Sequence, residues 1–116
     1  MPAPYMVKIA GVTFEGRQEI LSGLFDAQES SAQGHGPMLA ATLEREPQNQ
    51  FDSNAIKVVV DGKHIGYVPK YLAAKLAPRM DAGEAYAVTS VEIGGGSDGY
   101  SYGVTITIDV ATREAV

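Results

Sequence analysis

The sequence lacks cysteine altogether and contains only two histidines, His35 and His64. Without cysteine the chain can form neither a disulfide nor a thiolate metal site, and two histidines alone do not make a zinc site. We therefore expect no bound metal and no cofactor.

Long apolar runs are missing as well. No window approaches the ~18 consecutive apolar residues of a membrane helix. Residues 1–8 also lack the basic segment and the apolar stretch of a secretory signal. We expect a soluble cytoplasmic protein that makes no contact with a membrane.

Motifs of hydrolytic catalysis are absent too. The chain has no G-x-S-x-G elbow, no H-E-x-x-H and no carboxylate pair whose proximity the sequence would establish. The glycine-rich run 94–99 does not end in Gly-Lys-Ser/Thr and introduces no helix, so it indicates a hairpin connection and not a P-loop. A binding domain is a better interpretation than an enzyme.

Basic residues are fewer than acidic ones, nine Lys and Arg against fourteen Asp and Glu, which gives a net charge of -5. This balance argues against a protein that holds long nucleic acid through a broad cationic surface, but it leaves room for a small local site. Between residues 40 and 80 the basic residues outnumber the acidic ones, so any such site is expected there.

The 116 residues and the 45% apolar composition fit one domain, spanning 1–116, with a single core. Alternating apolar residues predict five or six short strands, and two stretches have helical spacing. The first predicted helix covers 17–25, and the polar residues 26–37 predict a flexible loop. The strand-like segments are 5–14, 38–45, 55–60, 84–93 and 102–110, and a further one follows residue 62 and includes His64.

The Asp-Gly pair at 61–62 predicts a two-residue hairpin turn. With that turn, Val58 would face Ile65 and Ile56 would face Tyr67 on the core side. Tyr67 is then expected at the edge of the core.

Pro69 predicts the start of a second short helix, because its fixed backbone angle suits a first turn. Pro78 and Gly83 would bring this helix to a stop. Short strands with one helix early and one between strands favour a mainly β fold, namely a small modified antiparallel barrel like the oligonucleotide-binding (OB) fold or the SH3 barrel.

The loop 45–54 supports two interpretations. Pro47 and Asn49 shape turns, and Asp52 and Asn54 can accept local backbone N–H bonds, so a structural loop explains much of it. Phe51 fits that explanation less well, since an aromatic among polar loop residues either plugs the barrel end or stacks on a ligand ring.

Lys70 stands at the presumed helix start, where the helix dipole is already positive. A phosphate would offset that charge. The alternative is a solvated surface lysine.

Three segments, 9–17, 43–58 and 65–70, together resemble the HIRAN domain family. They read IAGVTFEGR, LEREPQNQFDSNAIKV and IGYVPK, and their order and spacing are compatible with that family. The resemblance is to the stand-alone bacterial or phage type, and it implies a modified OB barrel that captures single-stranded DNA, in particular its 3′ end, in repair, replication or restart. It also implies a helicase or a nuclease as a partner.

The resemblance implies roles for individual residues. Phe14 matches an aromatic that stacks on a base, Phe51 and Asp52 match an aromatic-Asp pair near the terminal nucleotide, and Lys70 matches a lysine that contacts phosphate. Tyr67 occupies a ligand-facing position.

Asn49 belongs with these residues, because it lies in the same binding loop.

The chain departs from the eukaryotic motif at one place. Where that motif has a basic residue followed by two aromatics, this chain has Thr13, Phe14 and Glu15. One cation and one ring are lost and a carboxylate is added, which predicts weaker DNA binding. A protein-interaction module that docks a nuclease or helicase, or its own copy, is therefore the alternative hypothesis.

Overall fold

The computed structural model describes residues 4–14, 16–32, 39–96 and 101–111. These residues form six strands and two helices. In chain order the elements are β1 (Tyr5–Lys8), α1 (Arg17–Ala32), β2 (Ala41–Arg45), β3 (Ile56–Val60), β4 (Lys63–Tyr67), α2 (Lys70–Asp81), β5 (Tyr86–Gly95) and β6 (Tyr102–Val110).

The strands build two three-stranded antiparallel sheets, with the orders β1-β6-β5 and β2-β3-β4. Beyond β1 the chain crosses to the other sheet, where Ala10 and Tyr67 exchange two backbone hydrogen bonds of 2.8 and 2.9 Å. This crossing ends the first strand at Lys8, before the predicted limit at residue 14.

The mainly β, antiparallel prediction is confirmed, but the prediction of a barrel is only partly met. On the side opposite the Ala10–Tyr67 bridge, β2 and β5 lie against each other without forming a ladder. Within the described residues the strands therefore make two sheets and not one closed barrel. Likeness to the OB or SH3 barrel stays a prediction.

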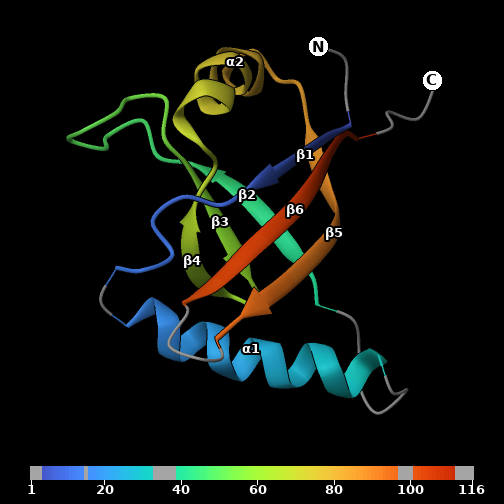
Figure 1. The fold of residues 1–116 in the computed structure, drawn as a ribbon. Coiled ribbons are helices and arrows are strands. Elements are labelled where there is room, and N and C mark those ends of the chain that lie inside the picture. Colours follow the sequence, from blue (N-terminus) through green and yellow to red (C-terminus); the bar gives the residue numbers. More distant parts are fainter. Residues whose placement is uncertain (1–3, 15, 33–38, 97–100, 112–116) are drawn as a thin grey trace.

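The core lies between the sheets and the two helices, which cover opposite ends of the strands (Figure 1). Alternate residues of β3 and β6 are fully buried, as expected for strands with one face on a core. The buried apolar residues are Tyr5, Val7, Ile9, Leu21, Leu24, Ala55, Ile56, Val58, Val60, Ile65, Val68, Leu72, Ala73, Leu76, Ala77, Ile93, Val104, Ile106 and Ile108.

The predicted turn between β3 and β4 is confirmed, because Asp61 and Gly62 both have positive φ, 49° and 79°. The predicted register is wrong. An irregularity between Val58 and Val59 shifts the pairing by one residue, so Val58 lies opposite Gly66 and Lys57 lies opposite Tyr67.

The shift has a physical consequence for the site. A one-residue shift moves a side chain to the other face of a sheet. Tyr67 therefore shares the outer face of this sheet with Lys57 and His64 and does not face Ile56.

Helix α1 is longer than predicted. It continues to Ala32, so residues 26–32, predicted as part of a flexible loop, are helical. The extension is held by Gln28, whose amide exchanges two hydrogen bonds of 2.7 and 2.9 Å with the backbone of Ile93 in β5. Sequence periodicity carries no sign of such a contact. Residues 33–37 of the predicted loop lie outside the described residues.

Helix α2 begins where predicted, with Pro69 at the N-cap position and Lys70 as the first helical residue. Its buried side chains have helical spacing, Leu72, Ala73, Leu76 and Ala77. Pro78 lies inside the last turn and does not stop the helix, which ends at Asp81. Among the described residues, neither helix is long and apolar enough to cross a membrane.

Candidate functional site

A hollow of about 290 Å³ opens between the β1–α1 connection, the loop 46–55 and the start of α2. All six residues predicted to form the site line this hollow, which is largely apolar. Its lining consists of Ala10, Phe14, Asn49, Phe51, Asp52, Ala55, Tyr67, Val68 and Lys70. The structure thus brings together residues from four separate segments of the chain, although their roles in binding stay predictions.

The loop 46–55 is shaped by Asn49. Its Oδ1 accepts hydrogen bonds from the backbone N–H groups of Phe51, at 2.8 Å, and Asp52, at 3.0 Å. Asp52 in turn accepts a 2.9 Å bond from the N–H of Asn54 through Oδ1. These bonds form local turns of the kind expected for Asn and Asp. The structural interpretation therefore holds for Asn49 and Asp52, and it leaves Phe51 without an internal role.

Arg45, at the end of β2, braces the same loop. Its guanidinium donates to the carbonyls of Ala55 and Ser53 at 2.8 and 3.0 Å. It also binds both carboxylate oxygens of Asp81 in α2, at 2.9 and 3.0 Å. A bidentate Arg–carboxylate pair constrains the orientation of both side chains in addition to pairing their charges. Arg45 therefore ties the loop to α2.

Glu46 connects Tyr67 to the loop. Its Oε1 accepts a 2.9 Å hydrogen bond from the Tyr67 hydroxyl and a 2.6 Å bond from Nδ2 of Asn49. Its Oε2 lies 3.9 Å from the ammonium of Lys57. The hydrogen bonds from Asn49 and Tyr67 lower the pKa of Glu46. The pKa of Tyr67 is raised, first by burial and then by its bond to Glu46.

Two aromatic rings at the rim of the hollow face solvent. Phe51 is 91% exposed and Phe14 is 63% exposed. Exposed phenyl rings gain nothing for the core, whereas they offer flat apolar faces to a planar ligand. The sequence left open whether Phe51 plugs the end of the barrel or stacks on a ligand. Its exposure shows that it does not plug the end of the fold.

Lys70 contributes a positive charge at the start of α2. No side chain of the described residues caps this helix, so the N–H groups at its start have no side-chain partner among them. This arrangement suits an anion such as a phosphate.

Arg17 and His64 adjoin the hollow but were not singled out by the sequence. The Arg17 guanidinium lies 4.9 Å from the ring centroid of Phe14 and 5.6 Å from that of Tyr67. His64 packs edge-on against Tyr67, with ring centroids 4.9 Å apart. Burial and the charge of Arg17 lower the pKa of His64. Arg17 and Phe14 are only three residues apart, and His64 and Tyr67 share β4, whereas the contact of Arg17 with Tyr67 joins segments distant in sequence near the Ala10–Tyr67 bridge.

Glu46 was also missed, although its spacing of three residues from Asn49 could have indicated a local hydrogen bond. Arg45 gave no such indication, since its carboxylate partner Asp81 lies in another element.

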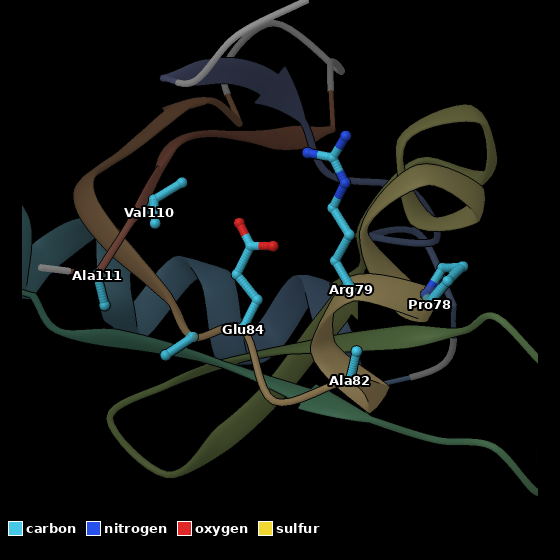
Figure 2. Close-up of a pocket in the computed structure, with 7 residues that line it drawn as sticks. Pro78, Arg79, Ala82, Glu84, Val110 and Ala111 are labelled. Carbon is cyan, nitrogen blue, oxygen red and sulfur yellow. The ribbon is translucent and has the colours of Figure 1, made fainter. Parts of the chain in front are cut away.

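A larger hollow, of about 820 Å³, lies at the far end of α2. Figure 2 shows Arg79 and Glu84 reaching into it beside Val110 of β6. Glu84 already accepts a 3.0 Å bond from the Tyr86 hydroxyl. None of the seven described lining residues has an aromatic ring. Size alone therefore does not make this hollow the better site for a planar ligand.

The smaller hollow offers groups that can bind a ligand. In the part of the chain that the structure describes, no three His, Cys, Asp or Glu residues could hold a metal ion together. The site combines ring faces, the cation of Lys70 and the carboxylate of Asp52, whose Oδ2 accepts no hydrogen bond from the described residues. This combination suits a ligand with planar bases, phosphates and a hydroxyl.

Comparison with known proteins agrees with the sequence resemblance. The family model of the HIRAN domain matches residues 40–111. A helicase-like transcription factor from Oryctolagus cuniculus is 58% identical over 40 residues, which is 34% of this chain and 4% of that protein. The chain therefore spans only a small part of this curated relative. No solved structure matches the chain.

Proposed function

This chain belongs to the HIRAN domain family, and on that premise we propose that it is a non-catalytic module that binds single-stranded DNA at a free 3′ end. HIRAN domains are DNA-binding modules. We place this one in DNA repair, replication or restart, as a stand-alone domain of the bacterial or phage type, beside a helicase or a nuclease.

One observation carries the proposal. The six residues Phe14, Asn49, Phe51, Asp52, Tyr67 and Lys70 line one hollow. They come from the β1–α1 connection, the loop 46–55, β4 and α2, so nothing in local folding requires them to meet. Their convergence supports a common ligand.

Each group has a role that follows from its chemistry. Phe14 and Phe51 stack on bases, since a base offers a flat face to an exposed ring. Lys70, with the first N–H groups of α2, binds a phosphate. Asp52 accepts a hydrogen bond from the terminal 3′ hydroxyl through the oxygen that the loop leaves open.

Asn49 and Tyr67 hold these groups in place. Asn49 fixes the backbone of Phe51 and Asp52, while Tyr67 forms one wall of the hollow. Both are bonded to Glu46, so the loop and β4 are held together before any ligand arrives. A preformed site saves the cost of ordering on binding.

The proposal is tested by fluorescence anisotropy at low salt with the full chain. Three probes are needed: a short single strand with a 3′ hydroxyl, the same strand with a 3′ phosphate, and a circular strand with no end. We expect the 3′ hydroxyl strand to bind most tightly. Equal affinity for all three would remove end capture, and no binding to any of them would remove DNA binding.

Asp52→Asn is the matched variant for end capture. It keeps the size and, through Oδ1, the local bond from Asn54, but it presents an N–H donor in place of the carboxylate oxygen that would accept from the 3′ hydroxyl. We expect it to reduce the preference for the hydroxyl end over the circular strand. Lys70→Gln should weaken binding to every strand.

The alternative function is docking of a protein partner. The larger hollow beside α2 favours it, because Val110 there is 44% exposed and the lining is rich in apolar atoms. A pull-down from the host should then recover a nuclease or helicase, and Lys70→Glu should leave that association intact. Loss of the association in Lys70→Glu would place the partner on the DNA site instead.

A further inference from the structure

The guanidinium of Arg17 lies beside the proposed DNA site, and most of its N–H donors have no hydrogen-bond partner among the described residues. It lies over the ring of Phe14 at 4.9 Å and over that of Tyr67 at 5.6 Å. Both rings line the hollow. Arg17 therefore contacts two of the rings that line the hollow, although it does not itself line it.

Arg17 is held in this position by the chain around it. It is the first residue of α1, and its Nη1 donates a 2.6 Å hydrogen bond to the carbonyl of Gly11. A guanidinium carries five N–H donors. This is the one hydrogen bond that its side chain makes to the described residues, so several donors stay available.

The charge of Arg17 is not neutralised by a described carboxylate. Within 4.0 Å, the ion pairs of the described residues are Arg45 with Asp81 and Lys57 with Glu46. Arg17 instead acts on His64, whose protonation it opposes. A half-buried cation with no counter-ion among the described residues favours an incoming anion.

We propose that Arg17 binds a backbone phosphate of the DNA strand, next to the base that stacks on Phe14. This inference rests on the proposed function and extends it to a second phosphate contact, separate from that of Lys70. The planar donor array of Arg can bind two oxygens of a phosphodiester at once. Stacking against two rings orients that array before the strand arrives.

A purely structural Arg17 would only brace the segment from Gly11 to Phe14. The two roles differ in one measurable property. A phosphate contact releases counter-ions, so losing it lowers the slope of log affinity against log salt by about 0.7 for a single strand. Loss of a purely structural contact of Arg17 would weaken binding without changing that slope.

The first experiment measures anisotropy of a 3′ hydroxyl strand over a salt series for the wild type, Arg17→Gln and Lys63→Gln. Lys63 is exposed, lies at the hairpin turn and does not line the hollow, so it controls for net charge. We expect Arg17→Gln to weaken binding about tenfold and to lower the slope by about 0.7, while Lys63→Gln changes neither. An unchanged slope in Arg17→Gln would overturn the inference.

The second experiment locates the phosphate. Each phosphate of the strand is replaced in turn by an uncharged methylphosphonate, and each probe is titrated with the wild type and with Arg17→Gln. One position should cost the wild type about tenfold in affinity and cost the variant nothing further, because the contact is already gone. Fully additive losses at every position would also overturn the inference.

The outcomes separate the two proposals. If the wild type binds DNA and prefers the 3′ hydroxyl, but Arg17→Gln weakens binding without changing the salt slope, only the inference fails. If the wild type binds none of the strands, the proposed function itself fails.

Discussion

The Tyr67 hydroxyl donates a 2.9 Å hydrogen bond to Oε1 of Glu46, across the outer face of the sheet β2-β3-β4. The same oxygen accepts a hydrogen bond from Nδ2 of Asn49. One carboxylate therefore positions both Tyr67, which lines the hollow, and the loop that carries Phe51. A side chain outside the hollow thus holds two of the residues that line it.

Removing this carboxylate should loosen the site. Glu46→Ala leaves the Tyr67 hydroxyl and the Asn49 amide without their partner, so we expect DNA affinity to fall by about 1–2 kcal/mol, roughly tenfold. Anisotropy with the 3′ hydroxyl strand measures it. Glu46→Gln, which keeps an oxygen acceptor, should lose less. Glu44→Ala removes the same charge from an exposed position of β2, and an equal loss there would contradict the positioning role.

Acid should weaken the fold through the same group. The pKa of Glu46 is lowered in the folded protein by its bonds from Asn49 and Tyr67. Its contribution to stability is therefore complete above the ordinary pKa, 4.5, and is lost as the pH falls through the lower folded value. Thermal unfolding followed by circular dichroism should show that the melting temperature falls less with acid for Glu46→Gln than for the wild type. Identical declines would contradict this prediction.

Gly66 is required by the close approach of two backbones. A Cβ at this position would lie 2.5 Å from the carbonyl oxygen of Ala10 and 2.5 Å from Cγ2 of Ile9. Gly66→Ala should lower the free energy of unfolding by about 1–3 kcal/mol, because the bridge between the sheets must open. Gly23→Ala is the control, since nothing lies within 4 Å of its Cβ and α1 gains about 0.5–1 kcal/mol. Urea denaturation measures the free energy of unfolding of both variants. A Gly66→Ala variant as stable as the wild type would contradict this prediction.

Phe51 should matter for the ligand and not for the fold. It is 91% exposed, so Phe51→Ala should change the free energy of unfolding by less than about 0.5 kcal/mol. DNA binding should weaken by about 1–3 kcal/mol if a base stacks on its ring. Tyr71→Ala removes another exposed aromatic, from α2, that does not line the hollow. Similar losses in the two variants would argue for a general aromatic surface.

The titration of His64 should respond to Arg17. Burial and then the charge of Arg17 lower the pKa of His64 in the folded protein. Removing that charge in Arg17→Gln should raise the pKa of His64 towards its ordinary value, as measured by NMR titration of the ring protons. Lys63→Gln should leave it unchanged. No change in Arg17→Gln would mean that the two side chains are further apart in solution.

The sequence predicted several residues that line the hollow, but not the contacts that hold them in place. Turn-forming residues, an aromatic in a polar loop and a proline before a lysine are local signals, and they led to Phe51, Asp52 and Lys70. Arg17 and Arg45 gave no such signal for their long-range contacts, because Tyr67 and Asp81 lie in elements distant in sequence. Contacts of that kind depend on how the sheets are joined.

The same division holds for the fold. Hydrophobic alternation and the Asp-Gly turn predicted the strands and the β3–β4 hairpin, since side-chain periodicity and turn conformation are properties of neighbouring residues. The bulge that turns Tyr67 to the outer face was not predictable, and neither was the extension of α1 beyond residue 25. A bulge and a helix end are settled by packing and by distant hydrogen bonds such as that of Gln28.

The sequence by itself determined which aromatic, acidic and basic residues were present for the proposed ligand, and in which short segments they stood. Only the tertiary structure decided that Phe14 and Tyr67 share one hollow with Arg17 against them. The physical reason is the Ala10–Tyr67 bridge, which joins the two sheets through a pair of backbone hydrogen bonds that no side-chain pattern encodes.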